Sequence, residues 1–295
     1  MSKPHLMIFG LGYSGLRLAR QCRTAGWRVS GTVRSAEKAA GLAAEGLGAM
    51  RFEAGIFLPE AALAGVTHVL DTTVPGPEGS DALPEVRRLF ARGMRPRWAG
   101  VLSSTAVYGD AGGAWVDEDT PPRPATSQGQ ARLAAEAAWT AWGAETGVPV
   151  MVFRLPGLYG PGRSAVEQVL SGKARRIHRA GHRTSRVHVD DVVAALRLVL
   201  DLRDPRSRIF NLADDEPAPT AETVDFACAL IGVPPPPLES WEALPPDDPG
   251  RRFFRESRLV SNARAKAELG WRPLYPSYRE GLRQTAGAAG VLPAT

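Results

Sequence analysis

The stretch that decides the fold is HLMIFGLGYSG, which spans residues 5–15. Its first five residues are typical of a short buried strand, and the glycines after them indicate a tight turn. Residues 13–25 carry apolar side chains close to helical spacing, and residues 27–33 are typical of a second strand. Strand, glycine turn, helix and strand within about 30 residues predict a βαβ crossover unit.

The alternation of helices and strands continues beyond this unit. Further helices are predicted at residues 36–46, 84–93, 130–146, 190–202, 262–269 and 278–288, and further strands at residues 50–53, 66–71, 98–103, 148–153 and 208–212. The strands lack the regular polar alternation of a sheet with one solvated face, which favours a parallel sheet covered by helices on both faces. We therefore predict a doubly wound α/β fold with a small C-terminal lobe.

Length and composition exclude several classes of protein. The 295 residues are 44% hydrophobic and 23% charged, so the chain can bury a sizeable core and is not expected to be disordered. No apolar run approaches the ~18 residues of a membrane helix, and the apolar run near the N-terminus is too short for a signal peptide. Cys22 and Cys228 are too far apart in sequence to indicate a disulfide framework or a zinc site. We expect a cytoplasmic protein without a metal site.

The three glycines of the turn match the requirements of a dinucleotide site. Gly10 permits the tight turn, Gly12 permits close approach of the backbone to a pyrophosphate, and Gly15 permits close packing of helix on strand. The pyrophosphate would lie at the helix N-terminus, facing N–H groups and the positive end of the helix dipole. The alternative is a glycine-rich turn that binds no ligand. The order of strand, turn and helix favours a cofactor site, which we assign to Gly10, Gly12, Tyr13, Ser14 and Gly15.

The end of the second strand bears on the choice between NAD and NADP. NAD selection requires a carboxylate there, to accept a hydrogen bond from the ribose. The segment 31–35 has none, and Arg34 lies just past the strand, where a guanidinium suits a 2′-phosphate. We therefore expect NADP rather than NAD. In the alternative interpretation, Arg34 is a solvated residue at the start of a helix and stacks on the adenine.

Four further motifs follow the glycine turn. They are SSTAVYGD at residues 103–110, RLPGLYGPGR at 154–163, HVDDV at 188–192, and SNAR at 261–264 together with ELGW at 268–271. In this order, and over almost the whole chain, they resemble the extended short-chain dehydrogenase/reductases of the NAD-dependent epimerase/dehydratase type. Within that superfamily the chain is most similar to the atypical branch of YeeZ-type bacterial proteins.

The resemblance implies two domains and further cofactor contacts. We place a nucleotide-binding Rossmann domain at residues 1–158 and a substrate lobe at residues 159–295, with residues 189–214 returning to the Rossmann domain. The family pattern also implies that the cofactor is contacted by Thr72, Ser103 and Pro156.

The chain departs from the family at the usual catalytic couple. Typical members carry Tyr-x-x-x-Lys at the start of the long helix, where the Lys lowers the pKa of the Tyr so that the phenol can exchange a proton with the substrate. The corresponding residues here are Gln128 and Arg132. A glutamine has no titratable proton, and an arginine stays charged at any working pH, so the standard acid–base couple is absent. Arg132 would still hold the nicotinamide ribose and is one catalytic candidate.

Ser104 is the other catalytic candidate. It aligns with the family's hydroxyl that hydrogen-bonds the reacting oxygen, or else it is a strand-end serine bonded to local backbone. Tyr108 and Tyr159 are interpreted as structural residues. Asp117 and Glu118 are interpreted as residues of a solvated loop, with a role as the missing acid left open.

The net charge is +5, and basic residues are concentrated in the predicted substrate lobe. Between residues 163 and 186, Glu167 is the only acidic residue among nine basic ones, which are Arg163, Lys173, Arg175, Arg176, His178, Arg179, His182, Arg183 and Arg186. Such a cluster near a cleft would focus an anionic ligand, whereas the alternative is a mobile loop in a protein from a GC-rich genome. No run of like charge is long enough to indicate nucleic acid.

These observations favour an NAD(P)-binding oxidoreductase or epimerase-like protein with a replaced proton donor. We predict NADP as the cofactor, a small anionic substrate such as one bearing a phosphate or a sugar, and a monomer or homodimer without a membrane partner. The alternative is a non-catalytic NADP-binding sensor or scaffold.

Overall fold

The computed structural model describes residues 3–53, 55–77 and 79–291, which fold into two compact units. Unit 1 comprises the described residues of Met1–Val107, Thr126–Arg154 and Val193–Phe210, and unit 2 those of Tyr108–Ala125, Leu155–Val192 and Asn211–Thr295. This division differs from the boundary expected after residue 158, because residues 108–125 group with unit 2. Their strand β6 (Trp115–Val116) pairs with β13 (Leu259–Val260), a segment far along the chain that no local pattern connects to it.

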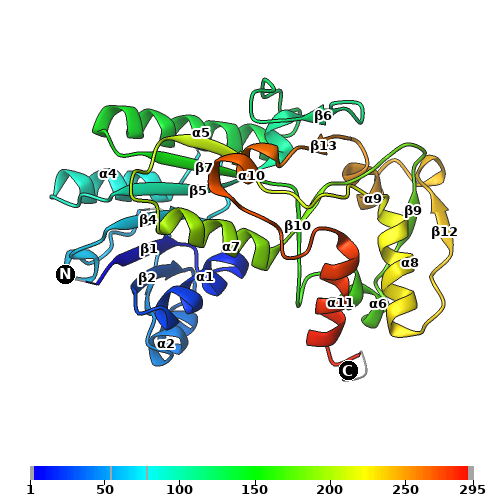
Figure 1. The fold of residues 1–295 in the computed structure, drawn as a ribbon, viewed down its shortest axis with the longest axis horizontal. Helices are drawn as coiled ribbons and strands as arrows, with labels where there is room; N and C mark the ends of the chain where they lie inside the picture. The colour runs from blue at the N-terminus through cyan, green and yellow to red at the C-terminus, as the bar shows by residue number, and fades with distance from the viewer. Residues whose placement is uncertain (1–2, 54, 78, 292–295) are drawn as a thin grey trace. The chain divides into compact units, whose positions relative to one another are not determined.

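Unit 1 is built on a parallel sheet. Within the described residues its seven strands lie in the order β11-β7-β5-β4-β1-β2-β3 (Figure 1). Their bounds are β1 His5–Phe9, β2 Arg28–Val33, β3 Gly48–Arg51, β4 His68–Asp71, β5 Trp98–Ser104, β7 Val150–Leu155 and β11 Arg208–Asn211. The strand order reverses between β1 and its neighbour β4, and in such sheets ligands bind outside the carboxyl ends of the strands at this switch point.

Helices cover both faces of this sheet. Their bounds are α1 Tyr13–Thr24, α2 Ala36–Ala44, α3 Glu60–Leu63, α4 Ala82–Ala91, α5 Ser127–Thr146 and α7 Val189–Leu200. In Figure 1, α4 and α5 lie on one face of the sheet, and α1, α2 and α7 lie on the other. The doubly wound α/β fold predicted from the sequence is therefore confirmed. No helix in the described ranges is long and apolar enough to span a membrane.

The core of unit 1 follows from the apolar strands. β1 is buried over its whole length, as its uninterrupted apolar run predicts. Met7 and Phe9 of this strand share a buried cluster with Trp139 and Trp142 of α5. The two indole rings meet edge to face with their centroids 5.6 Å apart, a favoured aromatic geometry. This packing fixes α5 on the sheet and so positions the residues at its start.

Unit 2 contains short strands and helices. Its strands form parallel pairs, β10 (Arg186–His188) with β8 (Gly157–Tyr159) and β12 (Leu238–Ser240) with β9 (Arg176–His178), besides β13 with β6. Its helices are α6 Ala165–Leu170, α8 Thr220–Ile231, α9 Pro249–Phe253, α10 Ala263–Leu269 and α11 Tyr278–Ala288. A small core that includes Val166, Ala227 and Leu282 lies between α6, α8 and α11.

The start of α5 and the existence of α8 are two points at which the structure differs from the sequence prediction. α5 begins at Ser127 rather than at residue 130, because the Thr126 side chain caps it by accepting a hydrogen bond from the Gly129 amide. α8 is absent from the prediction, since it follows Pro219 without a side-chain cap and so lacks the usual start signal.

We expect unit 1 to lose stability in mild acid. His5 and His68 are buried, and burial lowers the pKa of each from 6.5 to about 4, with the charges of Arg28 and Arg97 as second causes. The folded unit keeps both rings neutral while the unfolded chain takes up protons below pH 6.5, so stability falls between pH 6.5 and pH 4. The loss should be about 2 kcal/mol per histidine at pH 5. Urea unfolding of His68→Gln should show a smaller loss between pH 7 and pH 5 than the wild type, and an equal loss would contradict this account.

Candidate functional site

The turn after β1 has a geometry that requires glycine at two positions. Gly10 has a φ of 96°, and a β-carbon on it would lie 2.8 Å from Thr72 Oγ1. A β-carbon on Gly15 would lie only 2.3 Å from the carbonyl oxygen of Gly10. Thr72 donates its hydroxyl to that same carbonyl oxygen at 2.6 Å, which ties the turn to the end of β4. These contacts fix the path of the backbone from β1 into α1.

Gly12 differs from the other two glycines because it faces open space. A β-carbon on Gly12 would meet no described atom within 4 Å. Gly12 is also the N-cap of α1, whose described start has neither a side-chain cap nor an acidic residue in its first turn. A helix N-terminus of this kind attracts an anionic group through its N–H donors and its dipole. The turn therefore fits the pyrophosphate of a dinucleotide.

A cavity of about 360 Å³ opens beside this turn, within unit 1. Gly10, Gly12 and Arg34 of the predicted cofactor set line it, and so do Ser35 and Lys38. Ser35 caps α2 by accepting a hydrogen bond from the Lys38 amide at 3.2 Å. This side of the cavity thus combines two cations, a hydroxyl and a helix N-terminus, a set that suits a phosphate group.

Sequence reasoning singled out Arg34 but missed Ser35 and Lys38. Their signal is the spacing Ser-x-x-Lys directly after the arginine, which places a helix cap and a second cation in one turn. The remaining predicted cofactor residues do not line the cavity, and they are Tyr13, Ser14, Gly15, Thr72, Ser103 and Pro156. Gly15 and Thr72 support the glycine turn, whereas Pro156 belongs to unit 2. Direct contact of these six with a cofactor stays a prediction.

Arg132 joins two segments at the carboxyl edge of the sheet. Its Nη1 donates to the carbonyl oxygens of Thr73 at 3.0 Å and Leu102 at 2.8 Å, linking the loop after β4 to the end of β5. Burial lowers the pKa of Arg132, and the negative charges of Asp71 and Glu136 oppose this decrease. The arginine at the family's lysine position therefore has a structural task here. Its contact with a nicotinamide ribose stays a prediction.

Two buried carboxylates lie near Arg132. Asp71, at the end of β4, accepts hydrogen bonds from the hydroxyl of Ser80 at 2.6 Å and from the indole of Trp139 at 3.2 Å. Burial raises the pKa of Asp71, and these hydrogen bonds oppose the increase. Glu136 forms a buried ion pair with Arg154, with the closest nitrogen and oxygen 2.7 Å apart. Both carboxylates are thus engaged in holding α5 and its neighbours in place.

Two other residues of unit 1 occupy positions that are catalytic in the family, and they are Ser104 and Gln128. Ser104 Oγ accepts a hydrogen bond from the Ala106 amide at 3.1 Å, which fits the interpretation as a strand-end serine, although its own hydrogen remains available for donation. Gln128 is exposed in the first turn of α5, one turn before Arg132. Neither side chain titrates, so neither replaces the family's phenol as an acid.

The prediction of a solvated loop at residues 117 and 118 is wrong for Glu118. This side chain is buried, and its Oε1 accepts a hydrogen bond from the Asn211 amide at 2.7 Å. Burial raises the pKa of Glu118. Tyr108 donates to Asn211 Oδ1 at 2.8 Å, in keeping with its interpretation as structural. Asp117 is exposed and accepts a hydrogen bond from the Thr120 hydroxyl at 2.9 Å.

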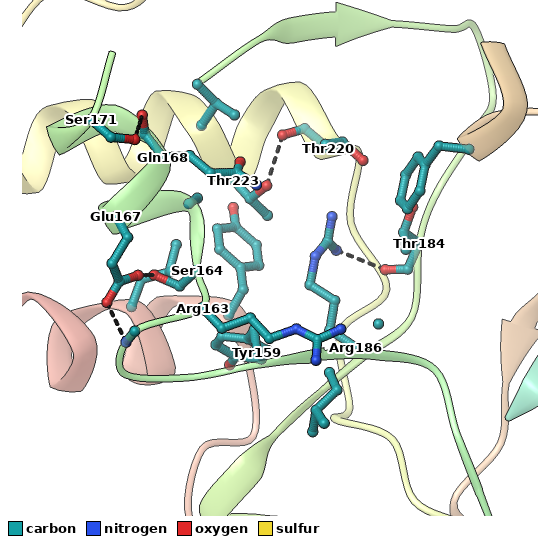
Figure 2. Close-up of a pocket in the computed structure, with 18 residues that line it drawn as sticks. Tyr159, Arg163, Ser164, Glu167, Gln168, Ser171, Thr184, Arg186, Thr220 and Thr223 are labelled. Atoms are coloured by element: carbon teal, nitrogen blue, oxygen red, sulfur yellow. Dashed lines mark hydrogen bonds between the residues drawn. The ribbon is translucent and has the colours of Figure 1, made fainter. Parts of the chain in front are cut away.

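A second cavity, of about 540 Å³, lies wholly within unit 2 (Figure 2). Residues 157–164 and parts of α6, α8 and α11 form its walls. Arg186 lines it and donates from Nη1 to the carbonyl oxygens of Thr184 at 2.7 Å and Ala218 at 3.0 Å. Figure 2 shows Arg163 extending from its loop into the cavity, on the side where Arg186 stands. Both arginines were part of the predicted basic cluster.

Asp214 and Tyr159 are buried titratable groups in the same unit. The Asp214 carboxyl group is buried, and its hydrogen bonds with the backbone of Arg186 and Glu216 favour the charged form. Burial raises the pKa of Asp214 to about 8, and the positive charge of Arg186 offsets part of the increase. Burial likewise raises the pKa of Tyr159, whose hydroxyl donates to the Ser277 carbonyl at 3.4 Å, in keeping with a structural interpretation. Sequence reasoning missed Asp214 because no local motif marks its burial.

Acidic residues elsewhere in unit 2 pair with two members of the predicted basic cluster, Arg175 and Arg176. Arg175 pairs with Glu239 at 2.5 Å and with Asp248 at 2.7 Å, and Arg176 pairs with Asp225 at 2.5 Å. These acids lie 49 to 73 residues further along the chain, so a local count of charges overstates the positive field. Of the nine basic residues, two line the described cavity.

Comparison with known proteins agrees with the fold. The family model "NAD dependent epimerase/dehydratase family" matches residues 90–213. YeeZ of Escherichia coli K12 is 30% identical over 283 residues, which are 91% of this chain and 95% of YeeZ. The chain belongs to the NAD-dependent epimerase/dehydratase family of extended short-chain dehydrogenase/reductases, as its motifs predict. A 3-diazoavenalumate denitrifying reductase of Streptomyces is 32% identical over 205 residues, which cover 66% of this chain and 64% of that enzyme.

Solved structures share the fold over nearly the whole chain. A conserved protein of unknown function from Silicibacter pomeroyi has a TM-score of 0.88 and 37% identity, and the match covers 97% of this chain and 99% of the other. MoeE5, solved in complex with UDP-glucuronic acid and NAD, has a TM-score of 0.79 and 22% identity, with 97% and 99% covered. The family and these neighbours thus include NAD-binding proteins, and MoeE5 also binds a sugar nucleotide.

Proposed function

We propose that the protein is an NADP(H)-dependent oxidoreductase that acts on a small anionic substrate. The observation that carries this proposal is the lining of one cavity by both the glycine turn and Arg34, Ser35 and Lys38. The turn accommodates a pyrophosphate, while the two cations and the start of α2 suit the 2′-phosphate that distinguishes NADP from NAD. When bound there, the nicotinamide dinucleotide would supply or accept a hydride.

The acidic residues of the cavity do not favour NAD. Glu53 and Asp81 line it, but neither lies at the end of β2, where NAD selection requires a carboxylate. Arg34 follows that strand directly. Glu53 is paired with Arg51 at 2.5 Å, which offsets its charge. The described lining thus holds two cations and two anions, and it is the place of Arg34 directly after β2 that supports NADP.

The second cavity supports an anionic substrate. Arg163 and Arg186 line it, and arginine is well suited to carboxylate and phosphate groups. The names of two similar proteins also point to organic anions, since MoeE5 was solved with UDP-glucuronic acid and the Streptomyces relative is a reductase of 3-diazoavenalumate. We propose that this cavity binds an anionic substrate. The two lining arginines are the main support, and the ligand and substrate named for these two similar proteins are secondary support.

One observation favours a second candidate function, an NADP-binding sensor without turnover. Gln128 and Arg132 occupy the positions of the family's acid–base couple, and neither gives up a proton near neutral pH. Consumption of NADPH in the presence of an organic anion distinguishes the two functions, because a sensor binds the cofactor without oxidising it.

Replacing Arg34 by alanine tests the cofactor choice. We expect Arg34→Ala to weaken NADPH binding by about 10- to 100-fold, because a charge-assisted hydrogen bond to the 2′-phosphate contributes roughly 1.5–3 kcal/mol. NADH lacks that phosphate, so its affinity should change little. Isothermal titration calorimetry with both cofactors measures the difference.

Arg206→Ala is the matched control. Arg206 is an exposed arginine of unit 1 that pairs with Asp204 and does not line the cavity. This variant removes the same charge from the same unit and should leave both affinities unchanged. If Arg34→Ala weakens NADPH and NADH equally, Arg34 stacks on the adenine instead, and the proposed NADP preference is wrong.

A further inference from the structure

We propose that the cavity of unit 2 binds an organic monocarboxylate with an apolar or aromatic body, rather than a nucleoside diphosphate. This inference rests on the proposed function, since it names the class of the anionic substrate. The cavity itself lies within unit 2, so its ligand can be tested without the dinucleotide site.

The charges around the cavity match a single negative charge. Among its described lining residues, Arg163 and Arg186 are cations and Glu167 is an anion, which leaves a net charge of +1. A carboxylate balances this charge. A diphosphate would bring a second negative charge beside Glu167 with no further cation in the lining to match it, and an unmatched charge is costly to remove from water.

Two hydrogen bonds hold the Glu167 carboxylate in place at the wall of the cavity. Its Oε1 accepts a hydrogen bond from the Gly162 amide at 2.6 Å, and its Oε2 accepts one from the Ser164 hydroxyl at 2.5 Å. Figure 2 shows both bonds on the loop that carries Arg163. The carboxylate therefore holds this loop in shape, and its negative charge is a fixed part of the wall.

Arg186 is positioned in advance to receive a carboxylate. Its two hydrogen bonds to backbone carbonyls both come from Nη1 and hold the guanidinium within the wall of the cavity. A guanidinium carries five N–H donors in a planar fork, so donors remain for a ligand. A planar carboxylate matches that fork with two parallel hydrogen bonds.

The rest of the lining suits an apolar body. Leu158 and Phe253 contribute exposed apolar surface, and the nearly buried side chains of Val224, Tyr278 and Leu282 lie behind them. Phe253 is 53% exposed, and its ring also packs edge to face on Phe254, with the centroids 5.2 Å apart. Small-molecule sites typically combine such an apolar wall with a few charged groups that fix orientation.

Calorimetry on the full chain with defined probes tests this inference. We expect 4-hydroxycinnamate and 3-phenylpropionate to bind more tightly than acetate, because only the larger anions cover the apolar wall. Cinnamamide, which has the same body without the charge, should bind at least tenfold more weakly than cinnamate. UDP and inorganic pyrophosphate should bind more weakly than 4-hydroxycinnamate.

Two arginine variants locate the binding. Arg163→Met, at an exposed position, and Arg186→Met should each weaken 4-hydroxycinnamate by about 10- to 100-fold. Lys173→Met is the control, since it removes one charge from the same segment outside the cavity lining and should change nothing. Because Arg186 also bonds to backbone, the exposed Arg163→Met variant decides the outcome if Arg186→Met unfolds.

The inference is overturned if UDP binds more tightly than every monocarboxylate tested, or if Arg163→Met leaves carboxylate affinity unchanged. A titration with NADPH in the same preparations separates this failure from failure of the proposed function. NADPH affinity that is intact in wild type and in Arg163→Met, together with absent carboxylate binding, refutes only the substrate class.

Discussion

Replacing Gly12 by valine should abolish NADPH binding while the protein stays folded. A β-carbon at this position meets no described atom within 4 Å, so the added side chain causes no clash. The backbone there, at φ −92° and ψ −148°, lies just outside the usual β region, so we expect a small loss of stability and an intact fold. The added side chain would occupy the space that a pyrophosphate needs at the start of α1. We expect NADPH affinity to fall at least 100-fold in calorimetry, with an unchanged far-ultraviolet circular dichroism spectrum.

Gly41→Val is the matched control for this variant. A β-carbon on Gly41 also meets no described atom within 4 Å, but Gly41 lies on α2 outside the cavity lining. This variant should bind NADPH as the wild type does. If Gly12→Val also keeps its affinity, the glycine turn does not hold the cofactor and the assignment of the site fails.

Restoring the family's acid–base couple should produce the second large effect. Reduction of a carbonyl leaves an oxyanion that needs a proton, and a positioned phenol typically supplies about 10²–10⁴-fold in rate. Gln128 and Arg132 lie one turn apart on α5, as the couple requires. We therefore expect the double variant Gln128→Tyr with Arg132→Lys to reduce phenylpyruvate with NADPH at least 100-fold faster than the wild type.

Two controls separate this gain from unrelated changes. Arg132→Lys alone measures the cost of altering the contacts with the Thr73 and Leu102 carbonyls. Gln130→Tyr with Arg132→Lys places the phenol at another exposed position of the same helix and should gain nothing. A wild type that already turns over rapidly, with a bell-shaped pH profile, would show that another residue supplies the proton, and Glu118 would then be replaced first.

The N-terminal βαβ segment could be predicted because the sequence signals for its strands, turn and helix are local. The apolar run of β1, the three glycines and the apolar positions of α1 all lie within about 20 residues, and each has one structural consequence. The same locality made Arg34 visible at the end of β2. Lys38 escaped notice because its importance depends on the turn of helix that Ser35 starts, which sequence spacing alone shows only faintly.

The cavity of unit 2 could not be predicted in the same way. One of its walls is α8, which begins without a cap, so no start signal marks it. The acids that offset the basic segment of this unit also lie far from it in sequence, as in the pair of Arg175 with Glu239. The burial of Glu118 likewise depends on Asn211, 93 residues away. Local sequence patterns do not indicate contacts between residues that are so far apart in the chain.

Fluorescence titration of the wild-type protein with NADPH and with NADH tests the central claim most directly. The reduced nicotinamide reports binding of either cofactor, and the two ligands differ only in the 2′-phosphate. The cations beside the glycine turn predict that NADPH binds about 10- to 100-fold more tightly than NADH at about 0.1 M salt. Equal affinities, tighter binding of NADH, or no binding of either cofactor would contradict the account.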